Sequence, residues 1–318
     1  MVDKFMDELI FLKPYCKDVI WGGTRLRSEY GYEGAGDKTG EAWVVSAMPG
    51  GESIVKNGLY AGQTLRELWR DHRELFGNAE GEEFPLLVKI IDAFDHLSIQ
   101  VHPDDGYAAA KENGANGKTE CWYILDCDEG ADIVIGHHAK TKDELRCMVE
   151  EGRWDDLINV IPLHKGDFFF ITPGTVHAIR KGTLLLEIQQ SSDITYRLYD
   201  YQRRQADGSF RQLHLQQSMD VIRCPQGFQK TEEEPKQAEG YTSQRLVSCE
   251  FFTVDKYLIS KQCVIDQTKP YLIVDVTEGE GLVNGQKIKK GEHFIATSKA
   301  EKLVFEGTME LVVSFQGN

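Results

Sequence analysis

One pattern of strand and turn signals occurs twice in this chain of 318 residues. Residues 165–183 read KGDFFFITPGTVHAIRKGT, residues 290–308 read KGEHFIATSKAEKLVFEGT, and the two segments align without a gap. Both contain Lys-Gly, an acidic residue, an apolar strand, a threonine and a closing Gly-Thr. Because such a repeat is one folding unit used twice, we expect two copies of a β-sandwich of the jelly-roll type.

The rest of the chain supports a mainly β fold with a division near residue 225. Short apolar segments between turn signals continue through the C-terminal part, which is an all-β pattern. Residues 225–240, PQGFQKTEEEPKQAEG, are polar, charged and poor in apolar residues, which is typical of a linker. We therefore expect a first domain over 1–225 with helical insertions, a linker over 226–240 and a C-terminal domain over 241–318. The inserted helices are expected after the caps Thr64, Asp104 and Thr141, and over 213–222.

Composition excludes several classes of partner. Thirty-six Lys and Arg against 51 Asp and Glu give a net charge of −15, so nucleic acid and anionic membranes are poor partners. No apolar run approaches the roughly 20 residues that a membrane-spanning helix needs. Seven scattered cysteines with no CxxC pair, and no signal peptide at the N-terminus, predict reduced thiols and a cytoplasmic protein.

Three segments bring together side chains that suit a metal ion. Gln100 and His102 alternate with apolar residues in SIQVHP, so a strand places both on one face. Glu120 lies near the start of the next predicted strand, and His177 follows a Pro-Gly turn. An amide oxygen, two imidazoles and a carboxylate suit a divalent transition metal. We expect a four-ligand site with an open position for water or substrate.

Each of these residues has a simpler explanation when it is taken singly. A lone histidine on a strand is usually hydrogen-bonded or exposed, and Glu120 has Lys118 as a nearby ion-pair partner. Lys89, in the apolar run 84–91, needs either a partner or an aqueous cavity. Residues 21–23, Trp-Gly-Gly, form either a tight turn or a wall of a ligand pocket. Three further residues are not expected to be ligands: His137 and His138, as surface histidines, and His293, as a strand residue.

Together, the motifs QVHP, KTE and PGTVH resemble those of the type I mannose-6-phosphate isomerases, in their short bacterial form, within the cupin superfamily. The likeness covers most of the chain and includes Trp21-Gly22-Gly23, GEAW at 40–43 and DITYRLYD at 193–200. It implies two cupin-like jelly-roll β-barrels with helical insertions. It also implies zinc binding by Gln100, His102, Glu120 and His177. In the aligned repeat His177 corresponds to Lys302, so the C-terminal copy is expected to lack the metal ligand.

The resemblance implies that one divalent metal, with Zn²⁺ expected, assists the interconversion of mannose 6-phosphate and fructose 6-phosphate through an enediolate. Arg197 and Lys118 are the expected catalytic residues, although Asp193 or Asp200 would pair with a purely structural Arg197. Trp21, Lys89 and Arg203 are the expected substrate-binding residues. The phosphate holder is left open among Arg203, Arg204, Ser46 and Ser98, and so is the general base. A monomer or a homodimer is expected, with a phosphorylated hexose as the small-molecule partner.

Two other classes of function remain as alternatives. A metal-dependent cupin oxygenase commonly has a His-x-His pair on the first ligand strand, and Gln100 departs from that pattern. A non-catalytic sugar-phosphate-binding cupin would not need a preserved set of metal ligands. An isomerase for another phosphorylated sugar also fits the motifs.

Overall fold

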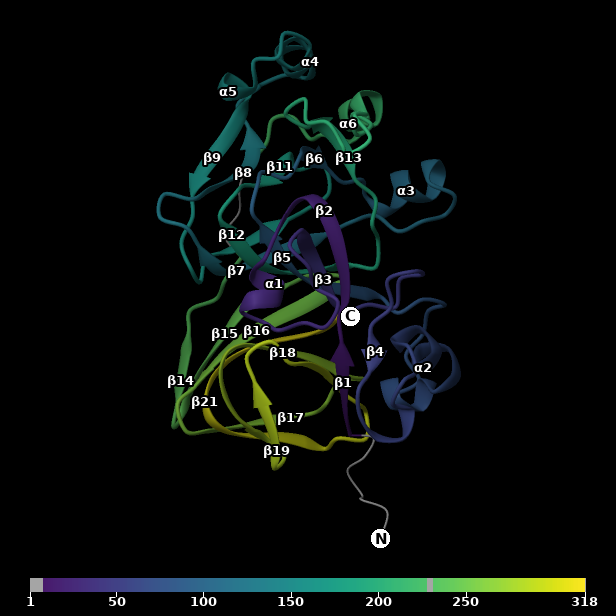
Figure 1. Cartoon of the computed structure of the whole chain (residues 1–318), viewed down its shortest axis with the longest axis vertical. Helices are drawn as coiled ribbons and strands as arrows, with labels where there is room; N and C mark the ends of the chain where they lie inside the picture. Colours follow the sequence, from purple (N-terminus) through teal and green to yellow (C-terminus); the bar gives the residue numbers. More distant parts are fainter. Residues whose placement is uncertain (1–7, 228–230, 318) are drawn as a thin grey trace.

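The computed structural model describes residues 8–227 and 231–317 and shows a mainly β protein with three sheets (Figure 1). The six-stranded sheet has the order β10 (Phe168–Ile171), β7 (Glu120–Cys127), β12 (Thr183–Gln190), β5 (Leu86–Ala93), β2 (Tyr15–Gly23), β3 (Thr39–Val45). The five-stranded sheet has the order β13 (Tyr196–Tyr199), β6 (Ile99–Val101), β11 (His177–Ile179), β8 (Asp132–His137), β9 (Ile158–Pro162).

The third sheet contains the C-terminal strands. Its path is β14 (Lys236–Ala238), β15 (Tyr241–Ser248), β16 (Phe252–Ile259), β21 (Lys302–Gln316), β18 (Leu272–Val283), β20 (His293–Ala296), β1 (Leu9–Lys13), β4 (Ile54–Val55). Two more strands pair at its side, β17 (Gln262–Asp266) with β21 and β19 (Gln286–Lys289) with β18.

Helices are short insertions between the strands. They are α1 (Arg25–Ser28), α2 (Leu65–Asp71), α3 (Asp105–Lys111), α4 (Lys142–Glu150), α5 (Trp154–Leu157) and α6 (Leu215–Val221), with 3-10 turns at Gly58–Tyr60 and Arg73–Phe76. The predicted caps are confirmed: Thr64 and Glu67 form a capping box at α2, and the Asp104 carboxylate accepts from the Tyr107 amide at α3. Within the described ranges, no helix has the length and apolar character needed to cross a membrane.

The six- and five-stranded sheets pack face to face. Ile91 and Trp122 of the six-stranded sheet share one apolar cluster with Ile135 and Ile179 of the five-stranded sheet. The opposite face of the six-stranded sheet packs on the ten-stranded sheet, where Val88 belongs to the same buried cluster as the C-terminal strands. Because β5 is covered on both faces, its sequence is almost continuously apolar, as the run 84–91 predicts.

The internal repeat is reproduced strand by strand. Phe168–Ile171 and His293–Ala296 occupy the same positions of the two aligned segments. The second strand of each copy begins at the aligned pair His177 and Lys302. The C-terminal copy therefore repeats the backbone pattern, and a lysine stands where the first copy carries a histidine.

Two strand pairings bear on the predicted division into domains. β1, from the first residues described, pairs with β20, with Ile10 opposite Ile295. In Figure 1, the purple β1 accordingly lies with the yellow C-terminal strands. Within the predicted linker, Lys236–Ala238 forms an edge strand on β15. The division into 1–225, 226–240 and 241–318 stays a proposal. Residues 9–13 and 54–55 fall in its first part by sequence but pair within the sheet of the C-terminal strands.

A chain ending at Pro225 is expected to aggregate. It removes the partner strand of β1 and exposes one side of the cluster that joins Val88 to Phe252 and Ile273, at about 1.5–3 kcal/mol for each large side chain that loses its cover. Size-exclusion chromatography of the truncated chain beside the full chain measures this. A soluble, monomeric and active fragment would contradict the view that the C-terminal sheet is a structural part of this fold.

Candidate active site

The five-stranded sheet places three predicted site residues in one row. Gln100 on β6 is the register partner of His177 on β11 and also of Arg197 on β13. Directly opposed residues of neighbouring strands point to the same face, so these three side chains project together. His102 follows Gln100 by two residues and shares that face, and Pro103 follows where β6 has ended.

The fourth predicted ligand comes from the facing sheet. Glu120 is the first residue of β7 and is fully buried, as is His177, while His102 is 1% exposed. One nitrogen or oxygen atom from each of His102, Glu120 and His177 lies within 4.8 Å of the others. The sandwich of two sheets thus brings together three of the four ligands predicted from the sequence.

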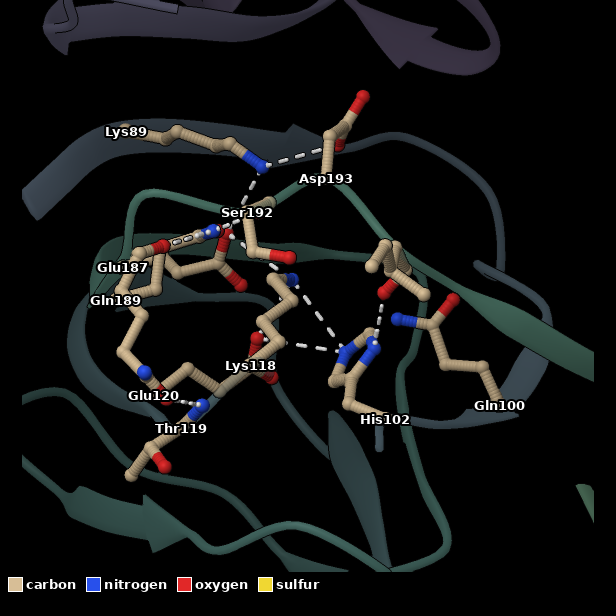
Figure 2. A network of polar contacts seen from close by, with 12 residues as sticks. Lys89, Gln100, His102, Lys118, Thr119, Glu120, Glu187, Gln189, Ser192 and Asp193 are labelled. Atoms are coloured by element: carbon tan, nitrogen blue, oxygen red, sulfur yellow. Dashed lines mark hydrogen bonds and ion pairs between the residues drawn. The ribbon is translucent and has the colours of Figure 1, made fainter. Parts of the chain in front are cut away.

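The candidate ligand atoms lie around a single point. The Nε2 atoms of His102 and His177 lie 3.1 Å apart, and the Glu120 carboxylate oxygens lie 3.4 Å from the first and 3.5 Å from the second. The Gln100 side-chain nitrogen lies 3.3 Å from His177 Nε2, and Figure 2 shows this amide directed toward His102. Tetrahedral zinc with bonds of ~2.1 Å separates its ligands by roughly 3.4 Å, close to these distances.

The hydrogen bond made by Nδ1 of each histidine ring determines which form of Nε2 faces the candidate metal position. His102 Nδ1 donates to the Ile194 carbonyl at 2.7 Å and His177 Nδ1 donates to the Thr175 carbonyl at 2.8 Å. Burial lowers the pKa of His177 to about 4 and holds the pKa of His102 well below its usual value, so both rings are neutral. Each Nε2 therefore presents a lone pair toward the Glu120 carboxylate, whose Oε2 is paired with the Lys118 ammonium.

These donors fit a divalent cation. Two lone pairs 3.1 Å apart beside a buried carboxylate repel one another unless a cation lies between them. The carbonyl acceptors behind both rings fix the orientation and tautomer that a metal ligand needs. Gln100 completes the set when its oxygen, which now accepts from Ser98 Oγ at 3.2 Å, is turned inward.

Lys118 lies directly beside the ligands. Its ammonium group is 2.6 Å from Glu120 Oε2 and 3.4 Å from His102 Nε2, and the residue is 4% exposed (Figure 2). Lys118 precedes β7 by two residues, in the segment that follows α3. The predicted catalytic lysine therefore lies in the same site as the candidate metal ligands.

A cavity of about 240 Å³ opens next to this centre, between the two sheets. Five of the residues predicted from the sequence line it: Trp21, Lys89, Gln100, Lys118 and Arg197. Of residues 21–23, Trp21 lines the cavity, and Lys89 has both of the expected surroundings, a carboxylate partner and the cavity. Ser98 lines the cavity too, whereas Ser46 is buried elsewhere.

One wall of the cavity carries a row of paired charged side chains, of which the sequence analysis selected Lys89. The Lys89 ammonium lies 3.2 Å from Glu187, its register partner on β12, and 3.8 Å from Glu41 and from Asp193. Trp122 Nε1 donates to Glu187 at 3.0 Å. Although burial raises the pKa of Glu187, the ammonium groups of Lys118 and Lys89 lower it to about 2, so this carboxylate is ionised.

The sequence analysis did not select Glu187, although the pattern that pointed to Lys89, a charged residue within an apolar strand, also applies to it. It is a charged residue in TLLLEIQQ, a buried apolar strand, as Lys89 is in LLVKIIDA. Two charged residues of opposite sign in two buried strands predict an ion pair if the strands are neighbours. The structure shows that the two strands are neighbours, because β5 pairs with β12.

Arg203 and Arg204 lie outside this cavity. Arg203 pairs with Asp200 at 2.6 Å and with Asp95 at 3.4 Å, and it lines a neighbouring, largely apolar pocket. The Arg204 guanidinium lies over the Phe210 ring and donates to the Gly208 carbonyl. Arg211, which the sequence analysis did not select, lines this cavity and also the neighbouring pocket.

One prediction about histidines was wrong. His137 was expected at the surface, but it is 5% exposed and its Nε2 lies 3.0 Å from the Arg223 carbonyl, because segment 222–226 covers this end of β8. His138 is exposed as expected. His293 is buried between Tyr32 and Asp275, each 2.6 Å away, in the C-terminal sheet.

Comparisons with known proteins identify the family. Residues 9–130 match the model for the phosphomannose isomerase type I catalytic domain, and residues 242–316 match the mannose-6-phosphate isomerase cupin domain. The chain is 47% identical over 311 residues to the mannose-6-phosphate isomerase ManA of Bacillus subtilis, covering 96% of this chain and 98% of that protein. A mannose-6-phosphate isomerase of Streptococcus mutans is 47% identical over 315 residues, covering 97% and 98%.

A solved structure agrees with these matches. The crystal structure of a mannose 6-phosphate isomerase from Bacillus subtilis superposes with a TM-score of 0.94 at 44% identity, covering 97% of this chain and 99% of that one. A putative mannosephosphate isomerase from Archaeoglobus fulgidus, at 21% identity and a TM-score of 0.77, shares the fold.

The fold and the site define a cupin with a buried His–Glu–His centre at the wall of a charged cavity. More narrowly, the chain belongs to the type I mannose-6-phosphate isomerase family. The family resemblance stated from the sequence motifs is thereby confirmed.

Proposed function

We propose that this isomerase interconverts mannose 6-phosphate and fructose 6-phosphate with one divalent metal, Zn²⁺ in the first place, held by His102, Glu120, His177 and Gln100. The observation that carries the proposal is the pair of neutral, oriented imidazoles facing a buried carboxylate next to a cavity lined by charged side chains of both signs. The names of the relatives from Bacillus subtilis and Streptococcus mutans support the choice of substrate.

The reaction moves a proton between two adjacent carbons of the sugar and develops negative charge on oxygen. When bound, the cation supplies Lewis-acid stabilisation of that charge, worth several kcal/mol. Arg197 lies across from Gln100 and presents its guanidinium to the same space, where one well-placed donor contributes roughly 3 kcal/mol. Both interactions grow as the charge develops, so they favour the transition state over the bound sugar.

Two further side chains act on the sugar itself. Lys118 has its ammonium group beside the ligands and faces the cavity, where it donates to a sugar oxygen during ring opening. Glu187, ionised and fixed by Trp122, accepts hydrogen bonds from sugar hydroxyls and holds Lys89 in the wall. Trp21 forms an apolar part of the same wall.

A coupled assay with mannose 6-phosphate, run beside elemental analysis of the purified protein, tests this function. We expect ketose phosphate formation and about one equivalent of divalent metal per chain. Removal of the metal with a chelator is expected to stop turnover, and added zinc, manganese or cobalt to restore it, because the lone pairs at the site need a cation.

The alternatives give different results in the same experiment. Binding of a sugar phosphate without any ketose product, with metal supplied, would favour a non-catalytic cupin. Bound iron with oxygen uptake would favour an oxygenase. Turnover of another phosphorylated sugar alone would keep the chemistry and change the substrate. The cytoplasm, proposed from the scattered cysteines, and a monomeric or homodimeric state remain predictions.

A further inference from the structure

The cavity contains a second guanidinium group besides that of Arg197. Arg211 lies between β13 and α6, and its side chain, 17% exposed, lines the cavity with Arg197, Lys89 and Lys118. Nothing in the sequence distinguishes it from Arg203 or Arg204, which lie a few residues earlier. Its place at the cavity therefore needs a structural explanation.

A buried carboxylate holds Arg211 in this position. Asp200, 5% exposed, accepts from Arg211 Nε at 2.7 Å and from a second guanidinium nitrogen of the same residue, which is a two-point fork. Burial raises the pKa of Asp200, but its hydrogen bonds to Arg211 and Arg203 outweigh burial and lower the pKa, so the carboxylate is ionised. Arg203 and Arg211 thus share the Asp200 carboxylate, and Arg203 has Asp95 as a second partner at 3.4 Å, whereas Arg211 has Asp200.

Arg197 adds an unpaired charge. Among the described residues no carboxylate lies within ion-pair distance of it, and its buried Nε has no hydrogen-bond partner. The two carboxylates that would serve a structural arginine are used elsewhere, since Asp193 pairs with Lys89 and Lys17, and Asp200 with Arg203 and Arg211. Burial and then the charge of Arg211 lower the pKa of Arg197, as expected for two like charges facing one space.

The two guanidinium groups differ in their position relative to the metal ligands. Arg197 is the register partner of Gln100, whereas Asp200 comes three residues later, roughly 10 Å along the chain at ~3.3 Å per residue. Asp200 therefore anchors Arg211 beyond Arg197 as seen from the ligands. In a hexose 6-phosphate the phosphate lies at the opposite end of the carbon chain from the reacting carbonyl.

We propose that Arg211, positioned by Asp200, binds the phosphate of the substrate and makes the cavity select phosphorylated over neutral sugars. The inference rests on the proposed isomerase function and assigns the phosphate to Arg211 in place of Arg203. Arg197 keeps its role at the reacting carbons. A phosphate dianion against Arg211 also relieves the repulsion between the two guanidinium groups, which explains how an acidic protein of net charge −15 holds an anion here.

The test compares Arg211→Gln with Arg203→Gln in the metal-loaded full chain. Both variants remove one partner of Asp200, so they share any structural effect of loosening that carboxylate. Arg211→Gln is expected to raise KM for mannose 6-phosphate roughly 10- to 100-fold, the range of one lost charged hydrogen bond, with a much smaller change in kcat and unchanged metal content. Arg211→Lys is expected to recover part of the loss, and the exposed Arg204→Gln to behave as wild type.

A binding measurement separates this inference from the proposed function. Calorimetry with a hexitol 6-phosphate, which has no carbonyl to isomerise, and with the free hexitol measures the preference for phosphate. We expect the preference to fall in Arg211→Gln in proportion to the KM effect. An equal preference in wild type and Arg211→Gln, or its loss in Arg203→Gln instead, would overturn the proposal. Phosphate selection through Arg211 without any isomerisation would uphold the anion site and reject the enzymatic function.

Discussion

Replacing His177 by alanine is expected to remove the metal and lower turnover at least roughly 10³-fold. His177 Nε2 lies 3.1 Å from His102 Nε2 and 3.5 Å from Glu120, so its loss opens one corner of the ligand set. Lewis-acid stabilisation of several kcal/mol then disappears, and each 1.36 kcal/mol is a factor of ten in rate. Elemental analysis and the coupled assay measure the two effects together.

The fold is expected to survive this change, because the Nδ1 hydrogen bond of His177 goes to the Thr175 carbonyl two residues away and joins no distant element. His137→Ala is the matched control, since His137 is also buried on the five-stranded sheet but bonds to the Arg223 carbonyl, away from the site. Circular dichroism is expected to be similar for both variants, with metal lost from one alone. A metal-free His177→Ala protein with full activity would reject the proposed centre.

Arg197→Lys is expected to keep the metal and to lower kcat by roughly 10²- to 10³-fold, the effect of losing one preorganised donor to a developing charge. Lysine retains the charge but lacks the planar fork, so its ammonium cannot reproduce both position and direction. Because the interaction belongs to the transition state, kcat and kcat/KM are expected to fall by similar factors. Steady-state kinetics on the metal-loaded variant measures this.

Arg180→Lys serves as the control for this substitution. Arg180 follows β11, is partly buried and pairs with Asp132 at 2.7 Å, but it does not line the cavity. Its replacement is expected to leave kcat within about twofold, in keeping with the small effects of partly exposed ion pairs. An unchanged rate in Arg197→Lys would remove Arg197 from the catalytic role.

Local patterns in the sequence were sufficient to predict the strands that carry the candidate metal ligands. Alternation in SIQVHP puts Gln100 and His102 on one face, and the structure places them so. The gap-free repeat predicts corresponding strands that include Phe168 and His293, and the structure has strands at Phe168–Ile171 and His293–Ala296. Such features depend on backbone geometry with a period of two residues, which neighbouring residues along the chain determine by themselves.

Contacts between segments that are far apart in the sequence could not be predicted from such local patterns. The pairing of β1 with β20 joins the first described strand to the C-terminal sheet, and a linker-like composition at 225–240 gives no indication of it. The ion pair of Lys89 with Glu187 likewise depends on β5 lying next to β12. In each case the partner is chosen by burial of apolar faces, which many strands of similar composition satisfy equally well.

The sequence by itself determined the family, the mainly β fold and the residues that converge on the candidate metal centre, because motif spacing and strand alternation are local properties of the chain. Only the tertiary structure decided which arginine faces the substrate cavity. Arg203 and Arg211 lie in the same irregular segment and bind the same carboxylate, but Arg203 lines the neighbouring pocket and not the cavity, whereas Arg211 lines both the pocket and the cavity next to the candidate metal centre. A side chain in a loop takes its direction from such long-range partners, and no period in the sequence records it.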